Sequence, residues 1–268
     1  MNGFKLDASD KWALITGASS GIGRALAHAF AARGYNLFLT ARNEPALRRV
    51  ARGCAEKFKV ATEVYIADLA DPQAVDALID ALSLEHHKFE ILVNNAGFGV
   101  QGAFQNTALN AELNMLHVQL DVMLKTTKAL LPGMVTRRSG RILNVASVYS
   151  FAPVAFQSVY AASKAFMLSF SGALSEELRG SGVTVTALCP GLTQTQFRVR
   201  AGIPEKRKVG GVTAEHIAEI AARQTLKGKR VVVTGFPNHL FAFLARRLPF
   251  VLVPRIVRFI NKTRGVSP

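Results

Sequence analysis

The chain has 268 residues, 49% of them hydrophobic and 19% charged, a composition typical of a globular protein and contrary to intrinsic disorder. Its two cysteines, Cys54 and Cys189, lie far apart without metal-ligand spacing, which argues against a disulfide framework or a metal site and indicates a reducing compartment. The formal net charge of +15 is unevenly distributed, because no acidic residue follows Glu219.

The first ten residues are polar and contain no apolar signal core, so we expect a short lead rather than a secretion signal. After this lead, short runs rich in valine, isoleucine and leucine alternate with longer helical patterns. Because the runs show little polar alternation, they indicate parallel strands that are covered on both faces. The expected strands are Trp12–Thr16, Asn36–Ala41, Val60–Ala67, Ile91–Asn94, Arg141–Ala146, Val183–Leu188 and Arg230–Thr234.

Helical patterns fill the intervals between the strands. The expected helices are Gly23–Arg33, Pro45–Lys57, Pro72–Glu85, Ala111–Val135, Ser158–Arg179 and Ala214–Leu226. This alternation predicts an α/β fold, a Rossmann-like doubly wound domain whose seven-stranded parallel sheet is flanked by helices, with ligand sites at the carboxyl ends of the strands. No linker divides the chain, so we expect one domain over residues 1–268, with a helical extension at 236–268.

The first strand leads into a glycine-rich turn, Thr16-Gly17-Ala18-Ser19-Ser20-Gly21-Ile22-Gly23, that opens the first helix. Gly17 can take the tight turn at little steric cost, Gly21 leaves room for a pyrophosphate beside the backbone, and Gly23 lets the helix pack close to the sheet. The free amides at the helix start favour an anion. The turn therefore predicts a dinucleotide-phosphate site, with an ordinary strand-to-helix turn as the alternative.

The second strand ends at Thr40-Ala41-Arg42, nineteen residues after Gly23. An acidic residue here would bind the ribose hydroxyls of NAD, whereas an arginine suits the 2′-phosphate of NADP. The forked guanidinium of Arg42 can hold a phosphate through two hydrogen bonds. We therefore expect NADP(H) as the cofactor, the alternative being an ordinary exposed arginine.

Tyr160 and Lys164 are four residues apart near the start of a predicted helix, so they share one face of that helix. A phenol needs its pKa lowered by roughly 3 units, about 4 kcal/mol, to be partly ionised at neutral pH. A cation about 4 Å away at an effective dielectric of ~20 supplies a similar free energy. The pair therefore predicts a phenol whose pKa the lysine lowers.

Five motifs in this chain occur in the order and spacing of one known family. They are the Thr16–Gly23 turn, Asn94-Asn95-Ala96-Gly97, Ser147, Tyr160-x-x-x-Lys164 and Cys189-Pro190-Gly191. With these motifs the chain resembles the short-chain dehydrogenase/reductase family over residues 11–234, most of its length. The resemblance implies an oxidoreductase that moves a hydride between nicotinamide and a carbonyl or alcohol carbon.

The resemblance also implies a role for each matching residue. Tyr160 would be the general acid in reduction and the base in oxidation, Lys164 would lower its pKa and hold the nicotinamide ribose, and Ser147 would donate a hydrogen bond to the substrate oxygen. Asn94 would brace the central strands. The implied cofactor contacts are Gly17, Ser19, Ser20, Gly21, Ile22, Gly23, Arg42, Asp68, Leu69, Asn95, Ala96, Gly97, Tyr160, Lys164, Pro190, Gly191 and Thr193.

Among these contacts, the family's pattern distributes the parts of the cofactor. Asp68 and Leu69 would contact the adenine, and residues 95–97 would line the adenosine ribose. Residues 190, 191 and 193 would shape the nicotinamide pocket, with the hydroxyl of Thr193 binding the carboxamide.

One position departs from the family's pattern. The family usually has an asparagine thirteen residues before the proline that closes the fourth helix, and counting back from Pro132 reaches Gln119. The family's asparagine is thought to hold a water that links the lysine to solvent. We expect Gln119 to hold the same water in a shifted place and to belong to the catalytic set. The alternative is an altered proton relay with slow turnover.

Loops at the strand ends supply the expected substrate pocket. Its wall is expected to carry five apolar side chains, namely Phe98, Val148, Phe151, Phe156 and Phe197. These predict an apolar carbonyl or alcohol substrate, the alternative being that the phenylalanines belong to the core. The basic segment Phe197–Gly211 is expected to form a mobile lid, or else an ordinary charged surface.

The tail, Pro237 to Pro268, alternates apolar clusters with arginines and predicts one or two amphipathic helices. The chain has no run of 18 uncharged apolar residues, so no membrane span is expected and the expected location is cytoplasmic. Two interpretations of the tail stay open. The favoured one is packing over the pocket or at a subunit contact; the other is peripheral binding at a membrane interface.

The leading hypothesis is an NADP-dependent dehydrogenase/reductase that acts on an apolar small molecule as a homo-oligomer, a dimer or tetramer. The alternative is a weakly catalytic NADP(H)-sensing or membrane-associated binding protein on the same fold. Gln119 and the basic tail support the alternative, whereas the intact set of Ser147, Tyr160 and Lys164 opposes it. Nucleic acid is not expected as a partner, because no recognised nucleic-acid motif accompanies the positive charge.

Overall fold

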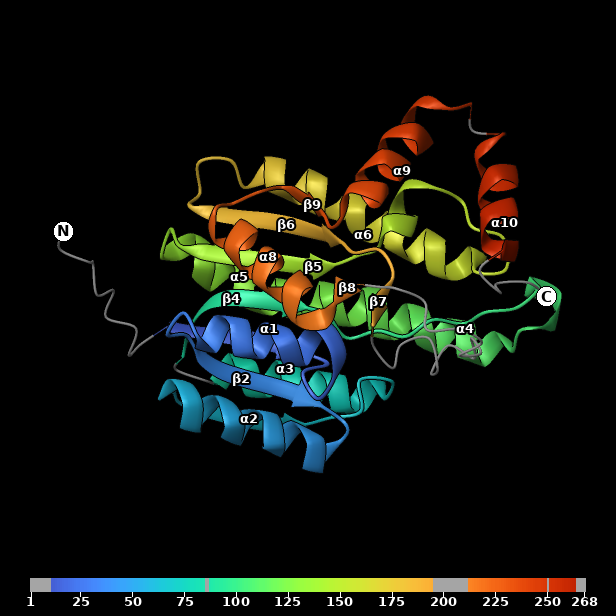
Figure 1. The fold of residues 1–268 in the computed structure, drawn as a ribbon. Coiled ribbons are helices and arrows are strands. Elements are labelled where there is room, and N and C mark those ends of the chain that lie inside the picture. The colour runs from blue at the N-terminus through green and yellow to red at the C-terminus, as the bar shows by residue number, and fades with distance from the viewer. Residues whose placement is uncertain (1–10, 85–86, 195–211, 250, 264–268) are drawn as a thin grey trace.

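A seven-stranded parallel sheet forms the centre of the protein in this computed structural model, which describes residues 11–84, 87–194, 212–249 and 251–263. The strand order is β3-β2-β1-β4-β5-β6-β9 (Figure 1). The doubly wound sheet predicted from the sequence is therefore confirmed. Its strands are β1 (Lys11–Thr16), β2 (Asn36–Ala41), β3 (Thr62–Ile66), β4 (Lys88–Asn94), β5 (Gly140–Val145), β6 (Val183–Cys189) and β9 (Val231–Val233).

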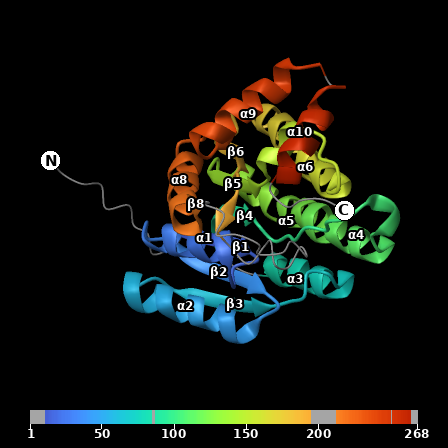
Figure 2. The same ribbon diagram turned by 45° about the vertical axis from the view of Figure 1, so that its right-hand side comes forward.

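Helices cover both faces of this sheet, as the two views show (Figures 1 and 2). One layer holds α1, α2 and α8, and the opposite layer holds α3, α5 and α6. The strand order reverses between β1 and β4, which creates the crevice where doubly wound sheets bind ligands. The helices are α1 (Gly21–Ala31), α2 (Glu44–Phe58), α3 (Pro72–Leu84), α4 (Leu109–Leu116), α5 (Val122–Thr136), α6 (Ser158–Glu177), α8 (Ala214–Leu226), α9 (Phe236–Arg247) and α10 (Val253–Thr263).

The first strand shows how the sequence builds the two layers. Successive side chains of a strand point to opposite faces. Ala13 and Ile15 therefore enter the core under α1, α2 and α8, whereas Trp12 and Leu14 enter the core under α3, α5 and α6. All four side chains are buried, so the strand is apolar throughout, as a strand covered on both faces requires.

A buried polar network links the two central strands to the helices above them. The side-chain amide of Asn94 on β4 donates to Asn144 on β5 at 2.9 Å, and Asn144 donates to Ser171 on α6 at 2.9 Å. The hydroxyl of Thr126 on α5 lies 2.7 Å from the side-chain oxygen of Asn94. The bracing role expected for Asn94 is confirmed, and it sets the register of β4, β5 and α6 next to the site.

The helix predicted over Ala111–Val135 is interrupted in the structure. A π-turn, His117–Asp121, separates α4 from α5, and Gln119 is buried within it. Single π-helical turns of this type are frequent at functional sites. A second feature that the strand pattern missed is a short parallel ladder between β7 (Thr193–Gln194) and β8 (Val212–Thr213).

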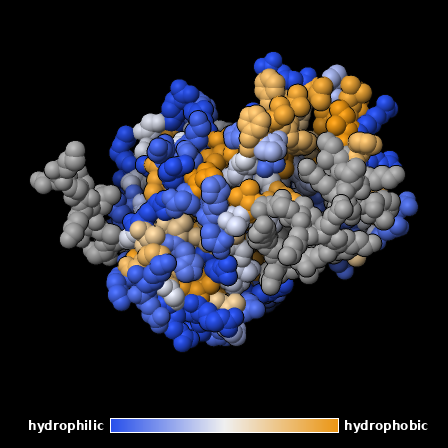
Figure 3. All heavy atoms as spheres, viewed as in Figure 1, coloured by the Kyte–Doolittle hydropathy of each residue, from blue (hydrophilic) through white to orange (hydrophobic). Residues whose placement is uncertain are grey.

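The tail forms two helices, α9 and α10, beside the sheet (Figure 1). Val253 and Val257 of α10 pack with Ala152, Val154 and Ala161, so the tail covers the segment between β5 and α6. One side of these helices therefore packs on the chain itself, and the expected cover over a substrate pocket stays a prediction. Their outer side is apolar (Figure 3). No helix within the described ranges is long and apolar enough to cross a membrane.

Candidate active site

The glycine-rich turn joins β1 to α1 with left-handed backbone at two of its glycines. Gly17 has φ +67° and Gly21 has φ +55°, values that glycine adopts without strain. The amide of Gly17 donates to the Thr40 carbonyl on β2 at 2.9 Å, which anchors the turn over the neighbouring strand. The helix cap at Ser20 makes no side-chain hydrogen bond to the first turn, so backbone amides at the start of α1 are available to an anion.

Asn95 locks this turn from the end of β4. Its side-chain amide donates to the carbonyls of Thr16 at 2.9 Å and Gly17 at 3.3 Å. A Cβ atom on Gly23 would lie 2.4 Å from both that amide nitrogen and the Gly17 carbonyl oxygen. Gly23 therefore permits close packing of helix against turn, as the sequence predicts. The side chain of Asn95 therefore holds the glycine-rich turn together. Its expected contact with the adenosine ribose stays a prediction.

Thr16 completes the junction, a role that the sequence interpretation missed. Its hydroxyl oxygen accepts hydrogen bonds from the backbone amides of Asn95 and Ala96, both at 3.0 Å. The same hydroxyl donates to the Val93 carbonyl at 3.3 Å. One buried side chain on β1 therefore fixes the backbone at the end of β4, so that the turn and residues 95–97 lie together at one edge of the sheet.

Arg42 lies at the carboxyl end of β2, next to the residues that follow β3. Its guanidinium is 3.6 Å from the carboxylate of Asp68, and both side chains are largely exposed. Asp68 also accepts a hydrogen bond from the Ala70 amide at 3.1 Å, which holds the carboxylate toward its own loop. Leu69 is buried beside it. Arg42 is therefore an exposed cation at the carboxyl end of β2, and its contact with a phosphate stays a prediction.

Ser147, Tyr160 and Lys164 come together at the carboxyl end of β5. Ser147 caps the short 3₁₀ turn Val148–Phe151, where its hydroxyl accepts from the Tyr149 amide at 3.2 Å. A hydrogen bond also joins the side chains of Ser147 and Tyr160. Lys164 lies one turn further along α6, and all three residues are buried. The structure therefore brings the predicted catalytic set together.

Burial controls the ionisation of this pair. It raises the pKa of Tyr160, a shift that the hydrogen bond with Ser147 only partly opposes. It lowers the pKa of Lys164 to about 7, because the ammonium is removed from water. The amine donates to the Val145 carbonyl at 3.0 Å and lies 5.6 Å from the Tyr160 ring centre. In the chain alone, Ser147 and Lys164 therefore do not produce the expected lowering of the Tyr160 pKa.

Gln119 bridges the loop after β4 and the catalytic helix. Its amide nitrogen donates to the Phe98 carbonyl at 2.6 Å, and its amide oxygen lies 3.1 Å from the hydroxyl of Ser163. That hydroxyl is also 2.7 Å from the Tyr160 carbonyl, so its single proton is shared. Ser163 directly precedes Lys164, which makes Gln119 a positioning residue for α6. The water that the sequence interpretation assigned to Gln119 stays a prediction.

We expect Gln119→Ala to lower kcat well below the wild-type value. The Phe98 carbonyl would lose its donor in the interior, at a cost of about 1–3 kcal/mol in the free energy of unfolding. Steady-state kinetics and urea unfolding would measure the two effects. Gln119→Asn, which retains the amide, is the matched control and should recover part of kcat. An unchanged kcat in Gln119→Ala would contradict this role.

Asn238, at the start of α9, forms a contact that the sequence interpretation missed. A Cβ atom on Gly191 would lie 2.1 Å from the side-chain nitrogen of Asn238, so the two residues are in direct contact. That nitrogen donates to the Thr234 carbonyl at 2.6 Å. The hydroxyl of Thr193 is 3.0 Å from the Gly191 carbonyl, and Pro190 is buried. The tail therefore begins against the segment predicted to hold the nicotinamide.

The predicted substrate wall is only partly a single surface. Val148 is buried, whereas Phe98, Phe151 and Phe156 are half-buried. Arg246 and Arg258 from the tail lie over the rings of Phe151 and Phe156, 4.6 Å and 5.5 Å from their centres. Phe98 packs on the core instead, against the layer of α3 and α5. Phe197 and the expected lid, residues 197–211, lie outside the described residues.

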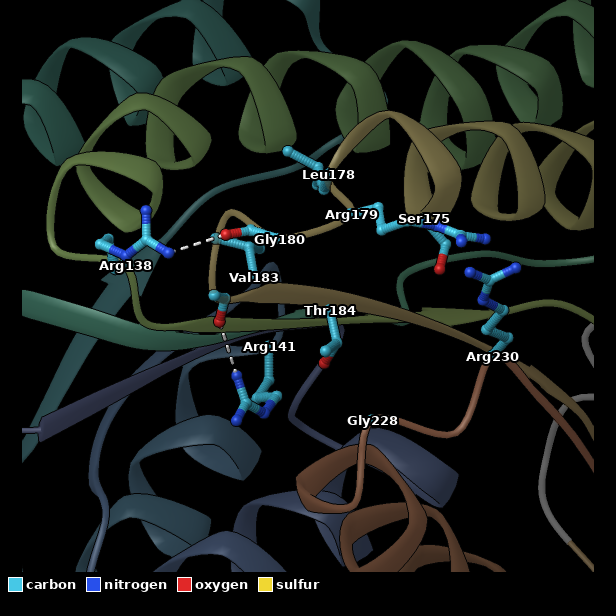
Figure 4. A pocket seen from close by; sticks show the side chains of 11 residues that line it. Arg138, Arg141, Ser175, Leu178, Arg179, Gly180, Val183, Thr184, Gly228 and Arg230 are labelled. Carbon is cyan, nitrogen blue, oxygen red and sulfur yellow. Dashed lines mark hydrogen bonds between the residues drawn. The ribbon is translucent and has the colours of Figure 1, made fainter.

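A hollow of about 570 Å³ lies at the other end of the sheet, where β5, β6 and β9 begin (Figure 4). Arginines line it, but two of them are bound to backbone carbonyls: Arg138 donates to Gly180 at 2.9 Å, and Arg141 to Gly182 at 3.1 Å. Arg230 is paired with Glu176 at 3.0 Å. These contacts show that the arginines link neighbouring loops. The hollow lies at the opposite end of the sheet from the predicted catalytic set.

Comparison with known proteins gives the family. Residues 11–205 match the sequence model of the short chain dehydrogenases, which spans the cradle, the Ser147 turn and the Tyr160–Lys164 helix. The chain belongs to the short-chain dehydrogenase family. The resemblance drawn from its motifs is therefore confirmed, and this short-chain dehydrogenase is placed among the oxidoreductases.

Relatives extend over nearly the whole of this short-chain dehydrogenase. A dehydrogenase/reductase SDR family protein 7-like from Anopheles gambiae is 33% identical, covering 95% of this chain and 83% of that protein. A short-chain dehydrogenase from Sphingobium yanoikuyae, solved with NADPH, is 31% identical with a TM-score of 0.80, covering 89% and 93%. The bulky-bulky ketone specific alcohol dehydrogenase from Comamonas testosteroni is 27% identical with a TM-score of 0.76, covering 89% and 92%.

Proposed function

We propose that the protein transfers a hydride between NADP(H) and a carbonyl or alcohol carbon of an apolar substrate, with Ser147, Tyr160 and Lys164 as its catalytic set. The observation that carries the proposal is the hydrogen bond between Ser147 and Tyr160, one helical turn from Lys164, at the edge of the sheet that holds the glycine cradle. A hydrogen-bonded hydroxyl pair at this place can bind one substrate oxygen and supply it with a proton.

The residues present fit a dinucleotide. The approach of α1 to Gly17 depends on the missing side chain of Gly23, and no side chain caps the first backbone amides of α1. The cofactor contributes the hydride chemistry when bound. Residues 17–23 would hold its phosphates, Arg42 the 2′-phosphate, and the segment of Pro190, Gly191 and Thr193 its nicotinamide end.

Burial sets the protonation state of Tyr160 in the chain without a cofactor. Because its raised pKa keeps the phenol protonated, Tyr160 can donate its proton to the oxygen of a carbonyl substrate. Ser147 would hold the same oxygen by a second hydrogen bond. The two hydroxyls would therefore supply the acid step of carbonyl reduction.

Arg42→Ala is expected to raise KM for NADPH by about 10- to 100-fold and to leave KM for NADH nearly unchanged. A hydrogen bond to a charged group is worth about 1.5–3 kcal/mol, and each 1.4 kcal/mol corresponds to a factor of ten. The measurement is steady-state kinetics with each cofactor. Arg48→Ala removes another exposed arginine, on α2, and is the matched control. Equal effects on both cofactors would exclude Arg42 as the phosphate contact.

The substrate class follows from the side chains around the catalytic set. Val148 and Phe151 come from the turn after Ser147, and Phe156 lies just before α6. The related Comamonas enzyme is specific for bulky-bulky ketones, which supports a bulky apolar ketone as substrate here. NADPH oxidation should be followed against a panel of such ketones and small polar carbonyls. Better turnover of the small polar compounds would refute the proposed class.

We propose a homo-oligomer formed through α4 and α6. A hollow of about 510 Å³ lies on this face, with Phe104, Leu120 and Phe166 among its lining residues. Leu109 and Leu113 on α4 are also exposed. Apolar side chains gathered around a hollow are typical of a protein contact. A monomer by light scattering at micromolar concentration would contradict this part of the proposal.

A further inference from the structure

We propose that the outer face of α9 and α10 binds an anionic lipid surface. This tail face consists of Phe236, Leu240, Phe243, Leu244, Ile256 and Phe259, all exposed. The inference concerns binding alone and is independent of the proposed reaction, because vesicle binding is measured without turnover.

The first observation is the two-sided character of α9. Ala242 is buried, and Phe241 and Ala245 are partly buried against the segment that precedes α6. Phe236, Leu240, Phe243 and Leu244 follow the helical period i, i+4, i+7 and i+8, so they form one stripe on the opposite side. The helix already has its protein contact on one side, and its second apolar stripe faces outward.

The same arrangement recurs in α10. Val253 and Val257, four residues apart, are buried against Ala152 and Val154. Ile256 and Phe259 lie on another side, 42% and 73% exposed. A short helix that buries one pair of apolar residues and exposes another has more apolar surface than its contact with the protein needs.

These residues gather into a single region of the surface. Of the sixteen large apolar side chains exposed in the described residues, nine lie between positions 236 and 259. Figure 3 shows an apolar area over α9 and α10. Monomeric proteins rarely expose a contiguous apolar area of this kind unless it binds a partner or a membrane.

The positive charge of the tail favours an anionic lipid surface as the partner of the tail face. No acidic residue follows Glu219 in the sequence, whereas the tail carries Arg246, Arg247, Arg255 and Arg258, all exposed. Arginines bordering an apolar helix face are typical of helices that lie in the interface of an anionic membrane. Two copies of the chain meeting through this face would bring like charges together, which opposes self-association.

The test is flotation of the full chain with two kinds of vesicle, one of phosphatidylcholine alone and one of phosphatidylcholine mixed with phosphatidylglycerol. We expect binding to the mixed vesicles, little binding to phosphatidylcholine alone, and release as salt is raised to about 1 M, where the Debye length falls to about 3 Å. The double variant Phe243→Asp, Phe259→Asp should lower the bound fraction about tenfold or more, since it removes two exposed aromatic side chains that would enter the lipid.

Leu84→Asp is the matched control, because Leu84 on α3 is 79% exposed and lies outside the tail face. It should bind mixed vesicles like the wild type, and thermal unfolding would show that both variants fold. Three results would overturn the proposal. These are no binding of the wild type, equal binding of the double variant, or a concentration-dependent dimer that the double variant abolishes while vesicles bind neither protein.

Discussion

Replacing Tyr160 with phenylalanine is expected to lower kcat for carbonyl reduction by a factor of about 10² to 10⁴. The substitution removes only the hydroxyl that is hydrogen-bonded to Ser147 and leaves the ring packed in the same buried place. Because the phenol is kept protonated by its raised pKa, it is the group that can deliver a proton to the substrate oxygen. The NADPH dissociation constant should stay close to the wild-type value.

Stopped-flow or steady-state oxidation of NADPH would measure the rate, and fluorescence titration would measure cofactor binding. Tyr65→Phe is the matched control, since Tyr65 lies on β3 and stacks on Phe38, away from the catalytic set. Retention of most activity in Tyr160→Phe would remove Tyr160 from the mechanism. Loss of both activity and NADPH binding would instead indicate that the Tyr160 hydroxyl acts in cofactor binding or in the fold, and thermal unfolding would separate the two.

Replacing Lys164 with methionine is expected to abolish turnover and to stabilise the cofactor-free protein at pH 7. Burial lowers the pKa of Lys164 from 10.5 to about 7, so the unfolded chain binds the proton more tightly than the folded chain. Between pH 7 and 10.5 the unfolded state therefore carries more protons, and the wild-type free energy of unfolding rises with pH in this window. Below pH 7 the full cost is present, up to about 5 kcal/mol.

The variant lacks this proton-linked cost, so its stability advantage should be largest near pH 7 and should shrink as the pH approaches 10.5. Loss of the hydrogen bond to the Val145 carbonyl offsets part of the gain. Urea unfolding at several pH values would measure the difference. Lys229→Met removes an exposed lysine and serves as control. Parallel stability curves for wild type and Lys164→Met would show that burial does not govern the lysine.

Both expectations rest on the same compromise between stability and function at Tyr160 and Lys164. Tyr160 and Lys164 are buried, and burial opposes the charged form of each. A protein selected for stability alone would place apolar side chains there. The proposed catalytic roles would offset this cost, because a dry site strengthens the electrostatic interactions of a phenol and an amine.

Features that depend on local period and spacing could be predicted from the sequence. Runs such as Leu37–Ala41 read as buried strands because every residue is apolar or neutral, and Tyr160 and Lys164 share a helix face because they are four residues apart. The turn at 17–23 follows from glycines at positions where the backbone takes positive φ or touches its neighbour. The fold class was predictable on these grounds, and the family was predictable from the resemblance of five motifs.

Contacts between residues distant in sequence became visible only in the folded structure. Asn95 locks the glycine turn, Gln119 joins the Phe98 carbonyl to Ser163, and Asn238 packs on Gly191. No spacing rule encodes such pairs, because their partners meet only after the sheet has assembled. The balance between burial and charge at Tyr160 and Lys164 belongs here too, since desolvation depends on everything packed around a side chain. The tail is a further example. Its apolar pattern predicted helices, but only the packed structure shows which apolar stripe is covered.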